Sequence, residues 1–191
     1  MIAGNIYHYL LYRLKARSKY DIHSPFVYKF YSQVLKDHTQ YPCYVELKNR
    51  FPSVHKFKYY RLLYRLSRYL NTGKIYFKGQ EDGAELSYLS GDFREIELQS
   101  GNFNISGPLN LTFIDLEHLE VVENGYFSKL LQHTNQDSVL IIWNLRESGT
   151  LRNEWKEIQK NPMVKITIDL FQVGLVFFRD ELSKEDFILR F

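Results

Sequence analysis

Asp115 and His118 are the two residues whose types and spacing best suit acid–base chemistry. Asp115 stands near the end of residues 109–116, a run typical of a buried strand, and His118 follows shortly after it. Because a histidine can act as a general base near neutral pH, these two residues form the candidate catalytic group. The alternative is structural: Asp115 caps a turn or a helix, and His118 is a surface residue.

Gly79 and Gly83 form the second candidate feature, a G-x-x-x-G turn after a short expected strand at residues 74–77. Glycine lets a backbone come close to a bound group, but an ordinary surface turn explains this spacing equally well. The sequence has no G-x-S-x-G elbow, Walker loop, H-E-x-x-H motif or Cys/His cluster. The single Cys43 excludes a disulfide framework, and we interpret it as a small, partly buried residue.

The composition is that of a folded domain with an uneven charge. The 191 residues, 45% of them apolar, suffice for one core, or for one core with a helical extension. No apolar run reaches the roughly 18 residues of a membrane span, so we expect a soluble, cytoplasmic protein. Residues 1–80 hold 15 Lys and Arg against 3 Asp and Glu, whereas residues 81–191 hold 10 against 19. The two halves either attract each other or serve different partners.

Residues 1–72 are expected to form a basic helical region. Ser24-Pro25 has the residue types that begin a helix, since serine caps the first free amides and proline suits the first turn. A further short helix is expected at residues 44–50 and a longer one at 54–70. Asn71-Thr72-Gly73 has the residue types that end a helix, so we divide the chain into 1–72 and 73–191.

The helix expected at residues 54–70 carries one basic stripe. Lys58, Arg61, Arg65 and Arg68 recur at helical spacing and fall on one face. Tyrosines between them could stack on bases, so the stripe is a candidate surface for nucleic acid or another anionic partner. The alternative is the solvated face of an amphipathic helix.

The second region is expected to form an α/β sheet. Strands are predicted at residues 95–98, 109–116, 138–143, 164–171 and 174–178, and helical segments at 84–89, 123–133 and 149–159. The last two strands are too close in sequence for a helix to join them, so they form an antiparallel hairpin. The order predicts a mostly parallel, doubly wound sheet with an antiparallel strand near one edge.

Several motifs resemble those of class I S-adenosylmethionine-dependent methyltransferases, in particular a bacterial O-methyltransferase-like group. The run HSPFV at residues 23–27 is similar to a signature in the group's N-terminal helical region. The runs TIDLF at 167–171 and GLVFFR at 174–179 are similar to the group's C-terminal end. Ile114-Asp115 with His118 resembles its DGxH segment. The resemblance implies a Rossmann-like methyltransferase fold and S-adenosylmethionine as the cofactor.

The cofactor-binding middle departs from that pattern. In active members the first strand ends in an acidic residue that takes the cofactor's ammonium group, followed by the glycine turn that Gly79 and Gly83 match. Here that acidic position is Phe77, and Lys78 adds a positive charge beside it. Residues 94–103 resemble the group's third strand, so the second strand and its ribose-binding acid are expected to be missing. In a rival alignment residues 94–98 are the second strand, with Glu95 or Glu97 as the ribose ligand.

The metal pair of the family is also altered. Metal-dependent members place an Asp after the fourth strand and a pair of acid or amide residues after the fifth, which suits a divalent cation. Asp115 is present, but the pair has become Trp143 and Asn144. We therefore expect no metal site.

Three functions follow from this pattern. The first is a methyltransferase-like scaffold or binding protein without cofactor binding, in which Phe77 and Trp143 fill the pocket. The second is an active S-adenosylmethionine-dependent methyltransferase, with an open cleft lined by Gly79, Gly83, Asp115 and His118. The third is a nucleic-acid or anionic-surface binder. A shortened sheet would expose strand edges, so a homodimer is expected.

Overall fold

The computed structural model describes residues 2–71, 74–80, 82–91, 97–99, 109–115, 126–146 and 149–191. Its first part is helical: α1 (Ile2–Lys15), the 3-10 turn η1 (Lys19–Asp21), α2 (Pro25–Phe30), the π-helical turn η2 (Tyr31–Leu35), α3 (Cys43–Arg50) and α4 (Phe57–Leu70). Then follow β1 (Lys74–Lys78), α5 (Ala84–Ser90), β2 (Glu97–Gln99), β3 (Leu111–Asp115), α6 (Tyr126–Leu131), β4 (Val139–Trp143), α7 (Gly149–Lys160), β5 (Ile166–Asp169), β6 (Val173–Phe177) and β7 (Glu185–Ile188).

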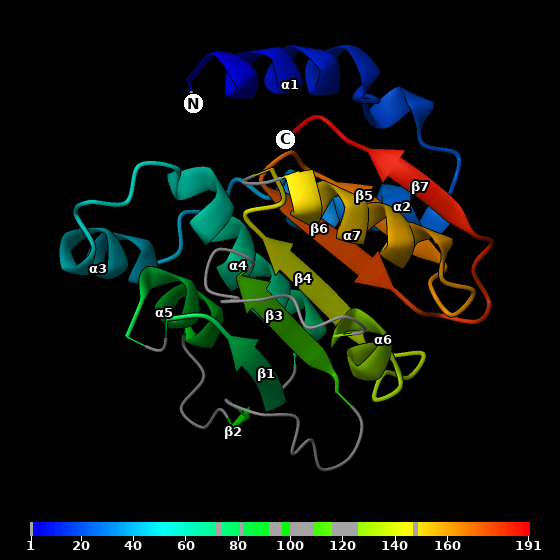
Figure 1. Cartoon of the computed structure of the whole chain (residues 1–191). Coiled ribbons are helices and arrows are strands. Elements are labelled where there is room, and N and C mark those ends of the chain that lie inside the picture. The colour runs from blue at the N-terminus through cyan, green and yellow to red at the C-terminus, as the bar shows by residue number, and fades with distance from the viewer. Residues whose placement is uncertain are drawn as a thin grey trace.

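The strands form one mixed sheet with the order β2-β1-β3-β4-β6-β5-β7 (Figure 1). The strands β2, β1, β3 and β4 pair in parallel, and β6 runs antiparallel to both β4 and β5. The predicted α/β class and the antiparallel hairpin are therefore confirmed. The edge strand β7, which pairs in parallel with β5, was not predicted.

The strand β2 pairs directly with β1, with Glu97 opposite Lys74. Within the described residues, it is the one strand on that side of β1. The expected loss of one strand there stays a prediction. The place of β2 beside β1 is equally that of a second strand, so pairing alone does not choose between the two alignments.

Two helical layers cover the two faces of the sheet. Because side chains alternate along a strand, Ile141 and Trp143 of β4 join the core under α2 to α5, whereas Leu140 and Ile142 join the core under α6 and α7. In Figure 1, α6 and α7 lie in front of the sheet and α2 lies behind it. The helices α2 to α4 thus share a core with the sheet, and the division at residue 72 stays a prediction.

Helix α4 is the main N-terminal contribution to this core. Leu62, Leu63 and Leu66 are fully buried, and burying such a side chain contributes about 2 kcal/mol. The helix ends at Asn71, which adopts the left-handed conformation and whose N–H donates to the Ser67 carbonyl. The Ser24 hydroxyl accepts from the Val27 N–H at the start of α2, so that predicted cap is confirmed.

Helix α1 lies over the C-terminal end of the chain (Figure 1). The hydroxyl of Tyr12 donates to the Leu189 carbonyl, and Leu10 and Leu14 keep exposed side chains. Across the described ranges, no helix is both long and apolar enough to cross a membrane.

Candidate functional site

Asp115 and Asn144 meet at the carboxyl edge of the sheet. Asp115 is the last residue of β3 and Asn144 directly follows β4, its parallel neighbour. Both side chains are buried, and the Asn144 amide donates a hydrogen bond of 2.9 Å to the Asp115 carboxylate. Asn144 has a φ of 58°, in the left-handed region that Asn tolerates better than most residues. The chain therefore turns sharply at this residue.

Two further residues extend the polar chain. The side-chain amide of Gln172 donates to the Asn144 Oδ1 atom, and Lys56 Nζ donates to Gln172 Oε1 at 3.0 Å. The chain from Asp115 to Lys56 therefore joins four segments: the ends of β3 and β4, the turn between β5 and β6, and the residues before α4. Such a network fixes the orientation of each amide.

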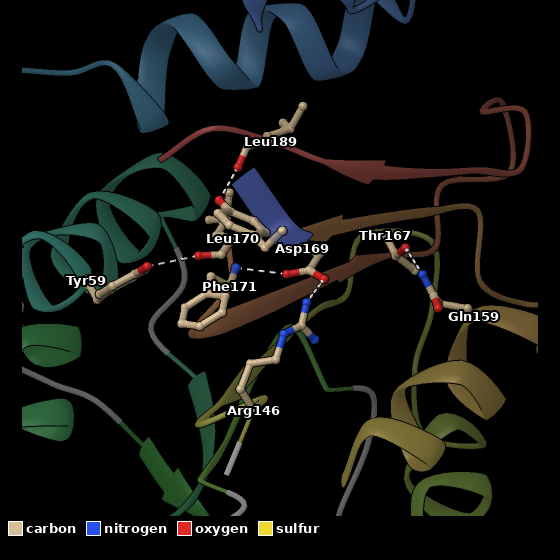
Figure 2. Close-up of polar contacts among 9 residues, drawn as sticks. Tyr59, Arg146, Gln159, Thr167, Asp169, Leu170, Phe171 and Leu189 are labelled. Atoms are coloured by element: carbon tan, nitrogen blue, oxygen red, sulfur yellow. Dashed lines mark hydrogen bonds and ion pairs between the residues drawn. The ribbon is translucent and has the colours of Figure 1, made fainter. Parts of the chain in front are cut away.

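The turn that carries Gln172 is itself held by polar contacts (Figure 2). Arg146 forms an ion pair with Asp169, whose other oxygen accepts from the Phe171 N–H at 2.8 Å, and the Tyr59 hydroxyl donates to the Leu170 carbonyl at 3.0 Å. Phe171 has a φ of 75°, a strained value for a non-glycine residue. These contacts stabilise the turn in the form that presents Gln172 to Asn144.

A cleft of about 540 Å³ opens beside this chain. It is lined by Arg50, Phe51, Pro52, Ser53, Val54, His55, Lys56, Tyr60, Gln80, Glu85, Asp115, Trp143, Asn144 and Gln172. One wall is aromatic, since the rings of Tyr60 and Trp143 meet edge to face with centroids 5.1 Å apart. The cleft can hold a small polar ligand against an aromatic surface.

Tyr60 and Glu85 are joined by a hydrogen bond in the wall of this cleft. The Tyr60 hydroxyl donates to Glu85 Oε1 at 2.8 Å. Burial first, and then the neighbouring carboxylate, raises the pKa of Tyr60 above its ordinary value. The phenol therefore stays protonated and acts as a hydrogen-bond donor, not as a base.

The glycine turn lies against aromatic rings. The rings of Phe77 and Phe113 stack with centroids 4.9 Å apart, and both are almost wholly buried. A Cβ added at Gly79 would lie 3.0 Å from Phe77 Cζ and 3.3 Å from Phe113 Cε1. At Gly83 it would lie 2.9 Å from the Gln80 carbonyl oxygen and 2.9 Å from Glu85 Oε2. A side chain at either glycine would therefore meet protein atoms, whereas Gln80 of the same turn lines the open cleft.

Only some of the site residues predicted from the sequence line this cleft in the described structure. Asp115 lines the cleft, as does Trp143, whereas Gly79 and Gly83 are not among the described residues that line it. Glu97 is the first residue of β2, but the described part of the structure does not include its side chain. The prediction for His118 also lies outside the described residues.

Sequence reasoning missed four residues of this site: Gln172, Lys56, Tyr60 and Glu85. One signal could have found Gln172. Since β6 runs antiparallel to β4, the turn before β6 must lie at the carboxyl edge of β4. Nothing comparable pointed to the other three.

The residues present can be compared with what a metal ion needs and with what S-adenosylmethionine, the cofactor that the resemblance implies, needs. Within the described ranges, no group of three or more His, Cys, Asp or Glu residues could hold a metal ion. The resemblance to methyltransferases assigns the acid that takes the cofactor's ammonium group to the end of β1, where this chain has the buried Phe77. An apolar ring offers no partner for a cation that needs a carboxylate.

The basic stripe of α4 is only partly open to solvent. Lys58 and Arg68 are exposed, whereas Arg61 and Arg65 are half-buried, Arg61 over the ring of Tyr44 at 4.9 Å. A uniformly solvated stripe is therefore wrong for its two central residues, because the loop after η2 and Phe191 pack around them.

No protein-family model matches this sequence, and no curated protein does. Solved structures do resemble it. A methyltransferase from Geobacter sulfurreducens superposes with a TM-score of 0.54 at 14% identity, covering 84% of this chain and 99% of that one. An O-methyltransferase of tomaymycin synthesis from Streptomyces achromogenes, solved with S-adenosylmethionine, gives a TM-score of 0.50 at 11% identity, over 80% and 95% of the two chains.

These likenesses define the class of fold. The chain is an α/β protein of Rossmann-like architecture, and its fold is that of S-adenosylmethionine-dependent methyltransferases. The expectation from the motifs is confirmed at that level.

Proposed function

We propose that this protein is a methyltransferase-like pseudoenzyme that has lost S-adenosylmethionine binding and acts as a scaffold or binding protein. One observation carries the proposal: the Phe77 ring lies at the end of β1, stacked on Phe113 and in contact with Gly79. The cofactor's methionine part would need the space that these rings occupy.

The charge at the turn supports the same proposal. S-adenosylmethionine carries a sulfonium and an ammonium cation, which need a carboxylate when they leave water. The strand instead ends in Phe77 and Lys78. Moving both rings would also expose apolar surface that is now buried, at a cost of about 2 kcal/mol for each ring.

The cleft beside Asp115 is then the ligand-binding part of the protein. It combines the buried Asp115–Asn144 pair with the aromatic wall of Tyr60 and Trp143. Such a mixture suits a small molecule with a hydrogen-bonding group and a flat apolar part. We further propose a cytoplasmic location from the composition.

The test is calorimetric titration of the purified protein with S-adenosylhomocysteine and S-adenosylmethionine. We expect no saturable heat below a dissociation constant of about 1 mM, in protein that shows a cooperative thermal transition. Saturable binding in the micromolar range would overturn the proposal.

An active S-adenosylmethionine-dependent methyltransferase is the second candidate. The position of the cleft favours it, because ligands of open α/β sheets bind outside the carboxyl ends of the strands, where Asp115 lies. This candidate predicts micromolar cofactor binding and methyl transfer that fails in Asp115→Asn. The same titration therefore separates the two.

A further inference from the structure

A second pocket, distinct from the cleft, lies beside the basic face of α4. Its volume is about 250 Å³. It is lined by Leu35, Lys36, Asp37, His38, Thr39, Gln40, Tyr44, Lys58, Arg61, Arg65 and Phe191. The residues come from η2 and the loop after it, from α3, from α4 and from residue 191, so the fold gathers them from distant parts of the chain.

Four of these lining residues are cations: Lys36, Lys58, Arg61 and Arg65. In the described part of the chain, none of the four has an Asp or Glu side chain within ion-pair distance. Within the described residues they contact aromatic rings and main-chain oxygens. Lys58 Nζ donates to the main-chain oxygen of Phe191 at 2.8 Å, and Arg65 donates to the Asp37 carbonyl.

Arg65 is the most constrained of the four. Its guanidinium is half-buried, and its Nε atom is buried without a hydrogen-bond partner. Burial lowers the pKa of Arg65, although the group remains charged at neutral pH. The guanidinium of Arg65 is thus held in the wall of the pocket by a main-chain carbonyl and not by a carboxylate.

The carboxylate of the pocket is already engaged. Asp37 Oδ1 accepts from the Thr39 N–H at 2.8 Å, and Oδ2 accepts from the Tyr41 hydroxyl at 2.9 Å. Asp37 therefore offsets one of the four positive charges, and the main-chain oxygen of Phe191 accepts from another of these cations, Lys58.

Two other cations, Arg13 and Lys36, act on Lys58. Its pKa is lowered by burial and by the positive charges of Arg13 and Lys36. An anion placed among these groups would be attracted by all of them at once.

We propose that this pocket binds the phosphate group of a small phosphomonoester. Arginine and lysine side chains that converge from several elements match the charge and the several acceptor oxygens of a phosphate. The aromatic rings of Tyr44 and Phe191 provide an apolar wall for the rest of the ligand. A concave site of this size fits a single phosphate better than the backbone of a nucleic acid, which needs an extended basic surface. The proposal does not depend on whether the cofactor binds in the main cleft.

The test is calorimetric titration of the full chain with phenyl phosphate and with inorganic phosphate at physiological ionic strength. We expect saturable binding of both. Arg61→Gln should weaken it by roughly tenfold or more, because one charge-assisted contact is lost. Arg61→Lys should retain part of the affinity. Arg68→Gln is the matched control, since Arg68 lies on the same helix but does not line the pocket, and it should change the affinity by less than about twofold.

Two arms distinguish the source of the phosphate group. Binding of phenyl phosphate alone indicates a soluble ligand, and additional binding to phosphatidylcholine vesicles that contain phosphatidic acid, lost in Arg61→Gln, indicates a lipid headgroup. Both support the site. Absence of saturable phosphate binding, or equal losses in Arg61→Gln and Arg68→Gln, would overturn it. Binding of a single-stranded RNA without binding of phenyl phosphate would also overturn it, and would favour an extended nucleic-acid surface.

Discussion

The amide of Asn144 donates to the carboxylate of Asp115 across 2.9 Å, and this bond joins the carboxyl ends of two neighbouring parallel strands. The position of each residue at the end of its strand does not by itself show that the two side chains meet. Asn144 reaches Asp115 because its backbone turns into the left-handed region directly after β4. The pair thereby forms the inner end of the polar chain that lines the cleft.

Replacing Asn144 separates the role of its side chain from that of its backbone. Asn144→Ala removes the amide and places an alanine at a φ of 58°, whereas Asn144→Gly removes the amide only. We expect both to destabilise the protein, Ala by about 1 kcal/mol more than Gly, because alanine resists the left-handed region. Urea unfolding measures the difference. Equal free energies of unfolding would contradict this account of the turn.

Gly79→Ala tests the contact between the glycine turn and the aromatic rings. Its Cβ would lie 3.0 Å from Phe77 Cζ, so we expect a loss of about 1–3 kcal/mol from overpacking. In the Phe77→Leu background the penalty should fall by about 1 kcal/mol, because the conflicting ring is gone. Additive effects in the double-mutant cycle would show that the ring and the turn do not touch.

The ion pair of Arg146 and Asp169 is predicted to hold the turn that carries Gln172. The two side chains are 16% and 7% exposed. Arg146→Met should cost about 3 kcal/mol, since it leaves a buried carboxylate without its cation. Arg146→Met with Asp169→Asn should cost less, because the amide keeps an acceptor for Phe171 without a charge. A double variant as unstable as the single one would argue against an electrostatic cause.

The lowered pKa of Asp37 predicts that the stability of the protein depends on pH. Burial alone raises the pKa of its carboxyl, but the hydrogen bonds from Thr39 and Tyr41 and the charge of Arg65 outweigh it, so the pKa lies below the ordinary 3.8. The unfolded chain therefore binds this proton more readily, and the stabilisation is present above pH 3.8 and lost as the pH falls through the folded-state pKa. Asp37→Asn should destabilise the protein at neutral pH and have a smaller effect at acidic pH. Unfolding curves at both pH values test this, and a cost independent of pH would contradict it.

The sequence predicted the central strands of the sheet but not its edge strand β7. Residues 139–143 are an unbroken apolar run, as expected for a strand buried on both faces. The strand β7 has the sequence EDFI, and its two acids hide the alternation that marks a strand. It forms because β5 offers it a partner, which local sequence does not reveal.

The polar chain of the site was beyond sequence reasoning for a similar reason. Asp115 was found because it ends an apolar run, and Asn144 was named only as part of the altered metal pair that the resemblance implies. Lys56 and Gln172 lie in separate connecting segments, 116 positions apart, and only the packed fold brings them together. The periodicity of α4 likewise placed Arg61 and Arg65 on one face but could not show which segments would cover it.

The central claim is that the Phe77 and Phe113 rings occupy the space a cofactor would need. A crystal structure determined with saturating S-adenosylhomocysteine tests it most directly. We predict that the rings remain stacked against Gly79 and that no adenosyl group lies along the turn from Gly79 to Gly83. An ordered S-adenosylhomocysteine along that turn, with the two rings displaced, would contradict the account.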